Sequence, residues 1–172
     1  MKRTIYILML VTLINCNTMS NIEKALHIEN ETKSLLKIEA IIWKKAEQSE
    51  NFENLTDAEQ TFVYVEALEA EVNNGGFDQY FFNTSGKYSQ ETLEALKKIG
   101  AVKTYKIVEE AFRIFPENPI PKDIEKRHDI LENINTATSE RWTELEDKFY
   151  LYEENIGGLL LKYVKEHKSE FE

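Results

Sequence analysis

The sequence predicts an all-α fold: a single compact domain of several helices joined by short loops. Apolar residues recur at intervals of three and four along most of the chain, as they do on one face of a helix. No run of four to eight residues alternates between apolar and polar side chains, as a half-buried strand does. All three prolines lie within residues 116–121, which form the clearest loop.

The helices are predicted in order from periodicity and from capping residues. One helical pattern covers residues 22–48. The next begins at the capping-box sequence of residues 56–59 and stops at residues 74–75, where Asn-Gly is a typical helix end. Ser89 is expected to cap a third helix, and Gly100 to end it, because glycine accepts a left-handed turn. The remaining helical patterns cover residues 102–115, 123–137, 139–152 and 156–167.

Composition limits the kind of partner. The chain has 172 residues, a length typical of one domain, and a formal net charge of −10. Direct binding to nucleic acid is therefore not expected, because phosphate contacts need clustered Lys and Arg. An acidic protein is better matched to a protein partner with a basic surface.

The N-terminal residues are typical of a secretory signal. Two basic residues at positions 2 and 3 precede an almost entirely apolar stretch, 5–14, which is too short to span a bilayer. Cys16, the only cysteine, follows this stretch and is preceded by Leu-Ile-Asn, an arrangement that resembles the lipobox of bacterial lipoproteins. Gly, Ala or Ser is usual before that cysteine, so Asn15 departs from the pattern. We expect a lipid on Cys16.

This interpretation divides the chain into three parts. Residues 1–15 would be a lipoprotein signal peptide, residues 16–34 a tether with the start of the first helix, and residues 35–170 the helical domain. The mature protein would be anchored to a membrane of the cell envelope through the lipid. The alternative is that Met19 is the true start, which would leave the protein in the cytoplasm.

Residues 72–86, VNNGGFDQYFFNTSG, are the most distinctive stretch. A structural interpretation is favoured: Gly75 and Gly76 permit positive φ and a sharp change of direction after a helix. Phe77, Tyr80 and Phe81 then share one face of a short helix and are expected to be buried.

The polar members of the same stretch leave a binding role open. Gln79 and Asn83 are expected to hydrogen-bond exposed backbone groups at the turn. Asn74 and Asp78, together with these two residues, would form the binding surface if the stretch contacts a ligand. A weaker alternative is an enzyme that uses Asp78, Gln79 and Asn83.

Catalysis, metals and cofactors are not expected. The three histidines, His27, His128 and His167, lie far apart in the sequence, whereas a metal site needs several convergent ligands. The chain contains no HExxH, CxxC, Walker or GxSxG motif. We therefore expect a protein that is not an enzyme.

The stretch Asn-Asn-Gly-Gly-Phe-Asp-Gln-Tyr resembles the signature of the domain family named after DNA mimic protein 19. The resemblance extends over residues 35–170 and includes the lead-in helix at 66–73, the Ile-Gly-Ala helix end at 99–101 and the boundary at 115–116. It implies an all-α fold and a non-catalytic role, in which an acidic surface imitates DNA and occupies a DNA-binding protein.

Acidic rows that could serve this role are separable from the motif. Their members are Glu47, Glu50, Glu66, Glu69, Glu140, Glu144 and Asp147. Lysines are interleaved with several of them, so a solvated face is the favoured interpretation. Two hypotheses follow. The favoured one is an exported, membrane-tethered binding module with an acidic face, and the other is a cytoplasmic DNA mimic that begins at Met19.

Overall fold

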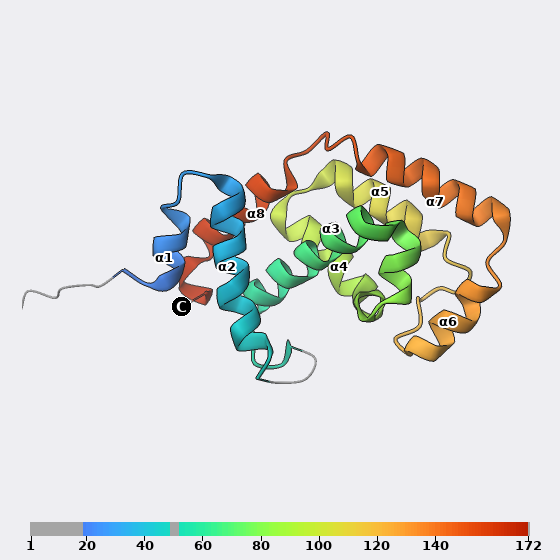
Figure 1. The fold of residues 1–172 in the computed structure, drawn as a ribbon, viewed down its shortest axis with the longest axis horizontal. Coiled ribbons are helices and arrows are strands. Elements are labelled where there is room, and N and C mark those ends of the chain that lie inside the picture. The colour runs from blue at the N-terminus through green and yellow to red at the C-terminus, as the bar shows by residue number, and fades with distance from the viewer. Residues whose placement is uncertain (1–18, 49–51, 172) are drawn as a thin grey trace, which may run out of the picture.

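The computed structural model describes residues 19–48 and 52–171, and all of the regular structure in these ranges is helical (Figure 1). The all-α prediction is confirmed. The α-helices are α1 (Asn21–Leu26), α2 (Glu31–Ala46), α3 (Asp57–Phe82), α4 (Ser89–Ile99), α5 (Val102–Arg113), α6 (Ile124–Glu132), α7 (Thr136–Phe149) and α8 (Ile156–Glu166). Two short 3₁₀ helices are η2 (Thr84–Tyr88) and η3 (Lys168–Glu170).

The single helix predicted over residues 22–48 is wrong, because the chain forms two helices there. Ser20 and Glu23 make a capping box that starts α1. Asn30 starts α2, since its side chain accepts a hydrogen bond from the Lys33 N–H at 2.9 Å. The Ser34 hydroxyl then donates to the Ala25 carbonyl at 3.0 Å and joins the two helices.

Two further boundaries differ from the prediction. Asn135 caps α7 by accepting from the Thr138 N–H at 2.9 Å, so residues 123–137 are not one helix and Ser139 does not start the next. Ser89 is the first residue of α4 and not its cap, and its hydroxyl donates to the Gly86 carbonyl at 2.7 Å. Gly100 does end α4 in the left-handed conformation, with φ of 78°.

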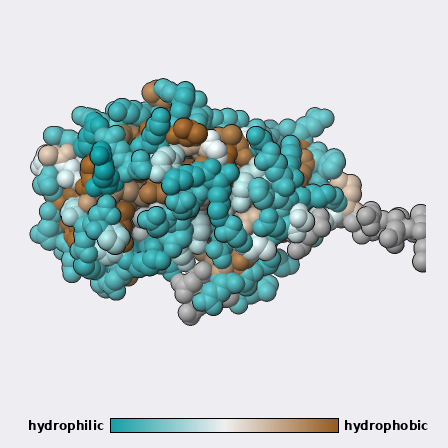
Figure 2. All heavy atoms as spheres, turned by 180° about the vertical axis from the view of Figure 1, so that it is seen from behind, coloured by the Kyte–Doolittle hydropathy of each residue, from teal (hydrophilic) through white to brown (hydrophobic). Residues whose placement is uncertain are grey.

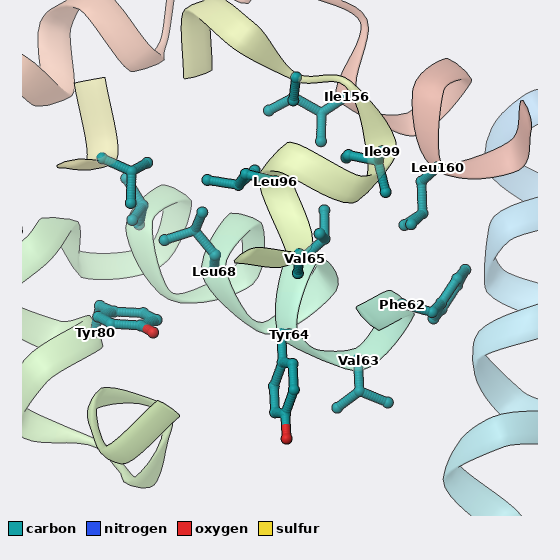
Figure 3. Close-up of a cluster of buried hydrophobic side chains, with 14 of the residues drawn as sticks. Phe62, Val63, Tyr64, Val65, Leu68, Tyr80, Leu96, Ile99, Ile156 and Leu160 are labelled. Atoms are coloured by element: carbon teal, nitrogen blue, oxygen red, sulfur yellow. The ribbon is translucent and has the colours of Figure 1, made fainter. Parts of the chain in front are cut away.

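The long helix α3 lies at the centre and contacts α4, α6, α7, α8 and η2. Its first half packs Val65 and Leu68 against Leu96 and Ile99 of α4, beside Ile156 and Leu160 of α8 (Figure 3). Its second half contributes Phe77, Tyr80 and Phe81 to a second group of buried aromatic rings. Because one helix supplies both groups, the core is continuous.

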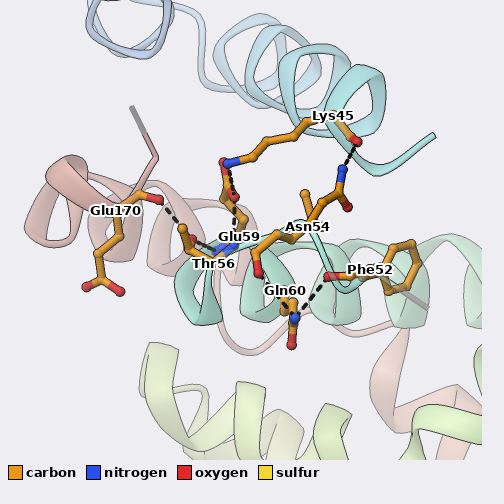
Figure 4. Close-up of polar contacts among 8 residues, drawn as sticks. Lys45, Phe52, Asn54, Thr56, Glu59, Gln60 and Glu170 are labelled. Carbon is orange, nitrogen blue, oxygen red and sulfur yellow. Dashed lines mark hydrogen bonds and ion pairs between the residues drawn. The ribbon is translucent and has the colours of Figure 1, made fainter. Parts of the chain in front are cut away.

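The two ends of the described chain are joined to each other. The C-terminus lies beside α1 and α2 in Figure 1. The Lys168 ammonium pairs with the Glu23 carboxylate. The Thr56 hydroxyl donates to the Glu170 carbonyl at 2.8 Å, and the Lys45 ammonium pairs with the Glu59 carboxylate at 2.7 Å (Figure 4). These contacts hold α2, the start of α3 and η3 together.

Hydrophilic residues cover most of the face shown in Figure 2, with hydrophobic residues between them. Within residues 19–48 and 52–171, no helix combines the length and the apolar character needed to cross a bilayer.

Candidate functional site

The glycine pair at residues 75–76 breaks α3 into two helical halves. Gly75 has φ −158° and ψ 24°, and Gly76 has φ 73° and ψ −169°, so neither residue is helical. A break of this kind leaves N–H and C=O groups without partners in the helix. The kink therefore needs hydrogen-bond partners from elsewhere in the chain.

These partners are Glu146 in the last turn of α7 and Tyr150, the residue that caps the C-terminal end of α7. The Glu146 carboxylate accepts the Phe77 N–H at 2.7 Å, at the start of the second half. The Tyr150 hydroxyl donates to the Val72 carbonyl at 2.8 Å, at the end of the first half. Burial raises the pKa of Glu146, although the hydrogen bond from Phe77 acts in the opposite direction. The kink is thus fixed by a carboxylate and a hydroxyl from the C-terminal end of α7.

The aromatic members of the motif are core residues. The side chains of Phe77, Tyr80 and Phe81 are fully buried. The Tyr80 ring stacks on the Phe112 ring, with the centroids 5.1 Å apart. The Phe81 and Trp142 rings are also adjacent, and their centroids are 5.1 Å apart. The structure therefore places these three residues where the sequence pattern predicts.

The polar members of the motif converge on Glu71 and not on the backbone. The Glu71 carboxylate accepts hydrogen bonds from Gln79 at 2.7 Å, Asn83 at 2.8 Å and Ser85 at 3.2 Å. Asn74 donates to the Gln79 side-chain oxygen at 3.0 Å. The expectation that Gln79 and Asn83 bond exposed backbone groups is wrong, because Glu71, on the other side of the kink, is within their reach. Asp78 is exposed and takes no part in this network.

Arg127 of α6 contacts the C-terminal end of the motif, and no sequence pattern indicated this contact. Its side chain is fully buried. The guanidinium donates to the carbonyls of Phe81 at 2.8 Å and Asn83 at 2.9 Å, at the end of α3. It also donates to the carbonyls of Pro121 at 3.0 Å and Lys122 at 2.9 Å. Because its partners are main-chain carbonyls, no complementary side chain in the sequence indicates that this arginine is buried.

The predicted acidic residues do not form one surface. Glu47 is exposed at the end of α2, and Glu50 lies outside the described residues. Glu140, Glu144 and Asp147 are exposed on α7, where Arg141 pairs with Glu144 and with Glu110. Part of the negative charge on α7 is therefore compensated.

Glu66 and Glu69 of α3 line a groove whose other walls are formed by α2 and by the segment that leads into α8. The groove has a volume of about 430 Å³, and Glu31 and Glu39 of α2 add two more carboxylates to its lining. Among the residues that the structure describes, no Lys or Arg lines it. Burial raises the pKa of Glu66 to about 7, and the Glu69 and Glu39 carboxylates act in the same direction. Sequence spacing on α3 indicated Glu66 and Glu69, but it could not predict that Glu31 and Glu39 of α2 line the same groove.

The walls of this groove are partly apolar. Leu36 is 58% exposed and Tyr152 is 45% exposed, and both line the groove. Tyr152 has φ of 46° and accepts a hydrogen bond from Asn73 at 2.6 Å, next to the motif. We call this feature, defined by Glu31, Glu39, Glu66, Glu69, Leu36 and Tyr152, the acidic groove.

The fold and these sites define a small all-α protein with a kinked central helix. The family model of DMP19-like proteins matches residues 53–167, and the chain belongs to the DMP19-like family. This match confirms the family resemblance that the motif indicated. No curated protein and no solved structure matches this chain significantly.

We expect Gly76→Val to lower the free energy of unfolding by about 1–3 kcal/mol. The φ of 73° disfavours a β-branched residue, and a Cβ atom there would lie 2.3 Å from the Glu146 Oε1 atom. Urea denaturation of both proteins gives the difference. Gly100→Val is the matched control, since φ at Gly100 is also positive but a Cβ there meets nothing within 4 Å. A loss at Gly76 no larger than that at Gly100 would show that the Glu146 contact adds no constraint.

Proposed function

We propose that this protein is a non-catalytic binding protein whose acidic groove receives a basic segment of a partner protein. One observation carries this proposal: four carboxylates line a groove whose described lining contains no Lys or Arg. The ion pairs of α7 show that other acidic side chains of this chain do find cations. A partner's Lys or Arg would supply the missing counter-charge in the groove.

The energetics of the groove favour this role. A desolvated carboxylate is destabilised in its charged form, which is why the pKa of Glu66 is raised. An incoming ammonium or guanidinium group would stabilise the charged form again. Leu36 and Tyr152 give the same partner segment an apolar contact, so we expect it to combine basic and apolar side chains.

The polar motif supports a structural role in preference to catalysis. Gln79 and Asn83 are engaged by Glu71, and Asp78 is exposed and separate from them. Among the described residues, no three His, Cys, Asp or Glu side chains are placed to hold a metal ion.

A cytoplasmic DNA mimic is the second candidate, and family membership favours it. In this role the protein would begin at Met19, and its acidic surface would occupy a basic DNA-binding protein. Helix α7 is a less suitable surface for mimicry than the acidic groove, because Arg141 and Lys148 lie among its carboxylates. The two candidates share a basic partner and differ in compartment.

The raised pKa of Glu66 predicts a pH dependence of stability. Its carboxyl binds a proton more tightly in the folded chain, at a pKa of about 7, than at the ordinary value of 4.5. The folded state therefore loses stability as pH rises from about 4.5 to 7. Glu66→Gln cannot ionise, so its gain in free energy of unfolding over wild type should be about 1–3 kcal/mol larger at high pH than at low pH.

Urea denaturation below and above this window measures the two gains. Glu140→Gln, which removes a carboxylate from an exposed position of α7 outside the groove, is the control. Equal gains for Glu66→Gln at the two pH values would contradict the desolvation of Glu66 in the groove.

Binding to the acidic groove is tested with a fluorescein-labelled peptide of alternating Lys and Leu residues. We expect salt-sensitive binding in fluorescence anisotropy, because exposed charge attraction is screened by ions. The double variant Glu66→Gln/Glu69→Gln should bind at least about fivefold more weakly, the effect of losing about 1 kcal/mol of binding free energy. Glu140→Gln/Glu144→Gln removes the same charge from α7 and should bind like wild type. Equal weakening by both pairs would mean that net charge, and not the groove, binds the peptide.

Export and lipidation are part of the proposal, and Cys16 lies outside the described residues. We expect the full chain, expressed in a bacterium with labelled palmitate, to take up label and to sediment with membranes. Cys16→Ser should do neither, because the thiol is the acylation site. Absence of label from wild type, with the protein in the cytoplasm, would favour a start at Met19 and the DNA-mimic alternative.

A further inference from the structure

Four aromatic rings from four parts of the chain meet at one edge of the core, beside the first half of α3. Trp43 comes from α2, Phe52 from the connection to α3, Tyr64 from α3 and Tyr88 from the end of η2. Phe52 is at the centre, with ring centroids 5.7 Å from Trp43, 6.2 Å from Tyr64 and 5.4 Å from Tyr88. Figure 3 shows Tyr64 pointing away from Leu68 and Leu96. Tyr64 belongs to the buried core, and Phe52 and Tyr88 pack against it, so these rings lie at the edge of the core.

A small cavity lies among the four rings. Its volume is about 60 Å³, and the rest of the lining is Val63, Ala67, Tyr80, Thr84, Ser85 and Thr92. A cavity of this size suits a compact head group and not a whole drug-sized molecule. Trp43 is 37% exposed, so one wall of the cavity is open to solvent. We call this feature the aromatic pocket.

The backbone of Phe52 is held in a conformation that a bulky residue disfavours. Its φ is 61°, in the left-handed region. Gln60 donates to the Phe52 carbonyl at 3.0 Å, and the Leu55 N–H donates to the same oxygen at 3.0 Å (Figure 4). Backbone strain that is fixed in this way is found at ligand clamps, and here it directs an aromatic ring into the pocket.

The surroundings of the pocket favour a cation. Aromatic faces attract cations, and methylated ammonium groups are recognised by several rings that surround them. The Tyr88 ring already has the Lys87 ammonium 4.7 Å from its centroid. On the far side of the wall, the Ser85 hydroxyl donates to the Glu71 carboxylate, which also accepts hydrogen bonds from the uncharged amides of Gln79 and Asn83. The negative charge of Glu71 therefore lies directly behind the pocket.

We propose that the aromatic pocket formed by Trp43, Phe52, Tyr64 and Tyr88 binds a methylated ammonium group. The motif then has a second consequence, since the bonds from Asn83 and Ser85 to Glu71 hold the turn that places Thr84, Ser85 and Tyr88 in the wall. The pocket does not depend on the partner of the acidic groove. It is nevertheless close to the groove in sequence, because Trp43 lies one helical turn after Glu39 on α2.

The test compares choline with 3,3-dimethyl-1-butanol, its uncharged carbon isostere. Trp43 is the reporter, because the second tryptophan, Trp142, is buried in the core and gives a constant background. We expect choline to shift the Trp43 fluorescence saturably, with an affinity at least fivefold above that of the isostere. Equal affinities, or a linear response to choline, would overturn the proposal.

Variants locate the site. Tyr88→Leu keeps an apolar side chain but removes one aromatic face, and it should weaken choline binding at least fivefold. Tyr105→Leu is the matched control, because the Tyr105 ring also has a lysine ammonium, that of Lys97, 5.0 Å from its centroid but lies outside the pocket. It should bind choline like wild type. Equal binding by wild type and Tyr88→Leu, or equal loss in both variants, would overturn the assignment to the pocket.

A second readout protects the test against misfolding. If Tyr88→Leu loses its helical circular dichroism, Trp43→Leu replaces it, with saturation transfer to the choline methyl protons as the measurement. Loss of transfer in this variant supports the pocket, and undiminished transfer overturns it. A peptide with one trimethyllysine, compared with its unmodified twin, then distinguishes a protein side chain from a free small molecule as the source of the group.

Discussion

The hydrogen bond from the Phe77 N–H to the Glu146 carboxylate is the contact on which the rest of this fold depends. It gives the second half of α3 an acceptor at its start, while Tyr150 satisfies the carbonyl at the end of the first half. With both sides of the break satisfied, α3 can change direction inside the protein. That change of direction carries Tyr80 and Phe81 into the aromatic core and brings Asn83 back towards Glu71.

The helices and their apolar faces could be predicted from the sequence, because periodicity and capping are local. The separation at Asn30 could not, since the apolar pattern continues across it and the capping hydrogen bond ends it. The boundary between α6 and α7 was predicted four residues too late, at Ser139, because the Asn135 cap was not recognised. The residues that hold the motif were equally hidden. Glu146 and Phe77 are 69 positions apart, and Arg127 is 46 from its partner Phe81. No pattern within one helix encodes such contacts.

The acidic residues illustrate the difference between charge in a sequence and charge on a surface. Spacing along one helix selected Glu66 and Glu69 as readily as Glu140 and Glu144. The structure separates these pairs, because α7 carries its own arginine whereas the groove collects carboxylates from two helices and no cation. Uncompensated charge is therefore a property of the packing between α2 and α3, and composition alone does not locate it.

Arg127 shows a different kind of constraint. Its guanidinium donates four hydrogen bonds to main-chain carbonyls, which every amino acid possesses. Substitutions at the partner positions leave those carbonyls in place, so they do not remove the need for an arginine at position 127. Ordinary pairs of side chains can drift together, each change being compensated by another. Arg127 has no such route, and a lineage that loses it must rebuild the junction of α3 and α6 by moving the backbone.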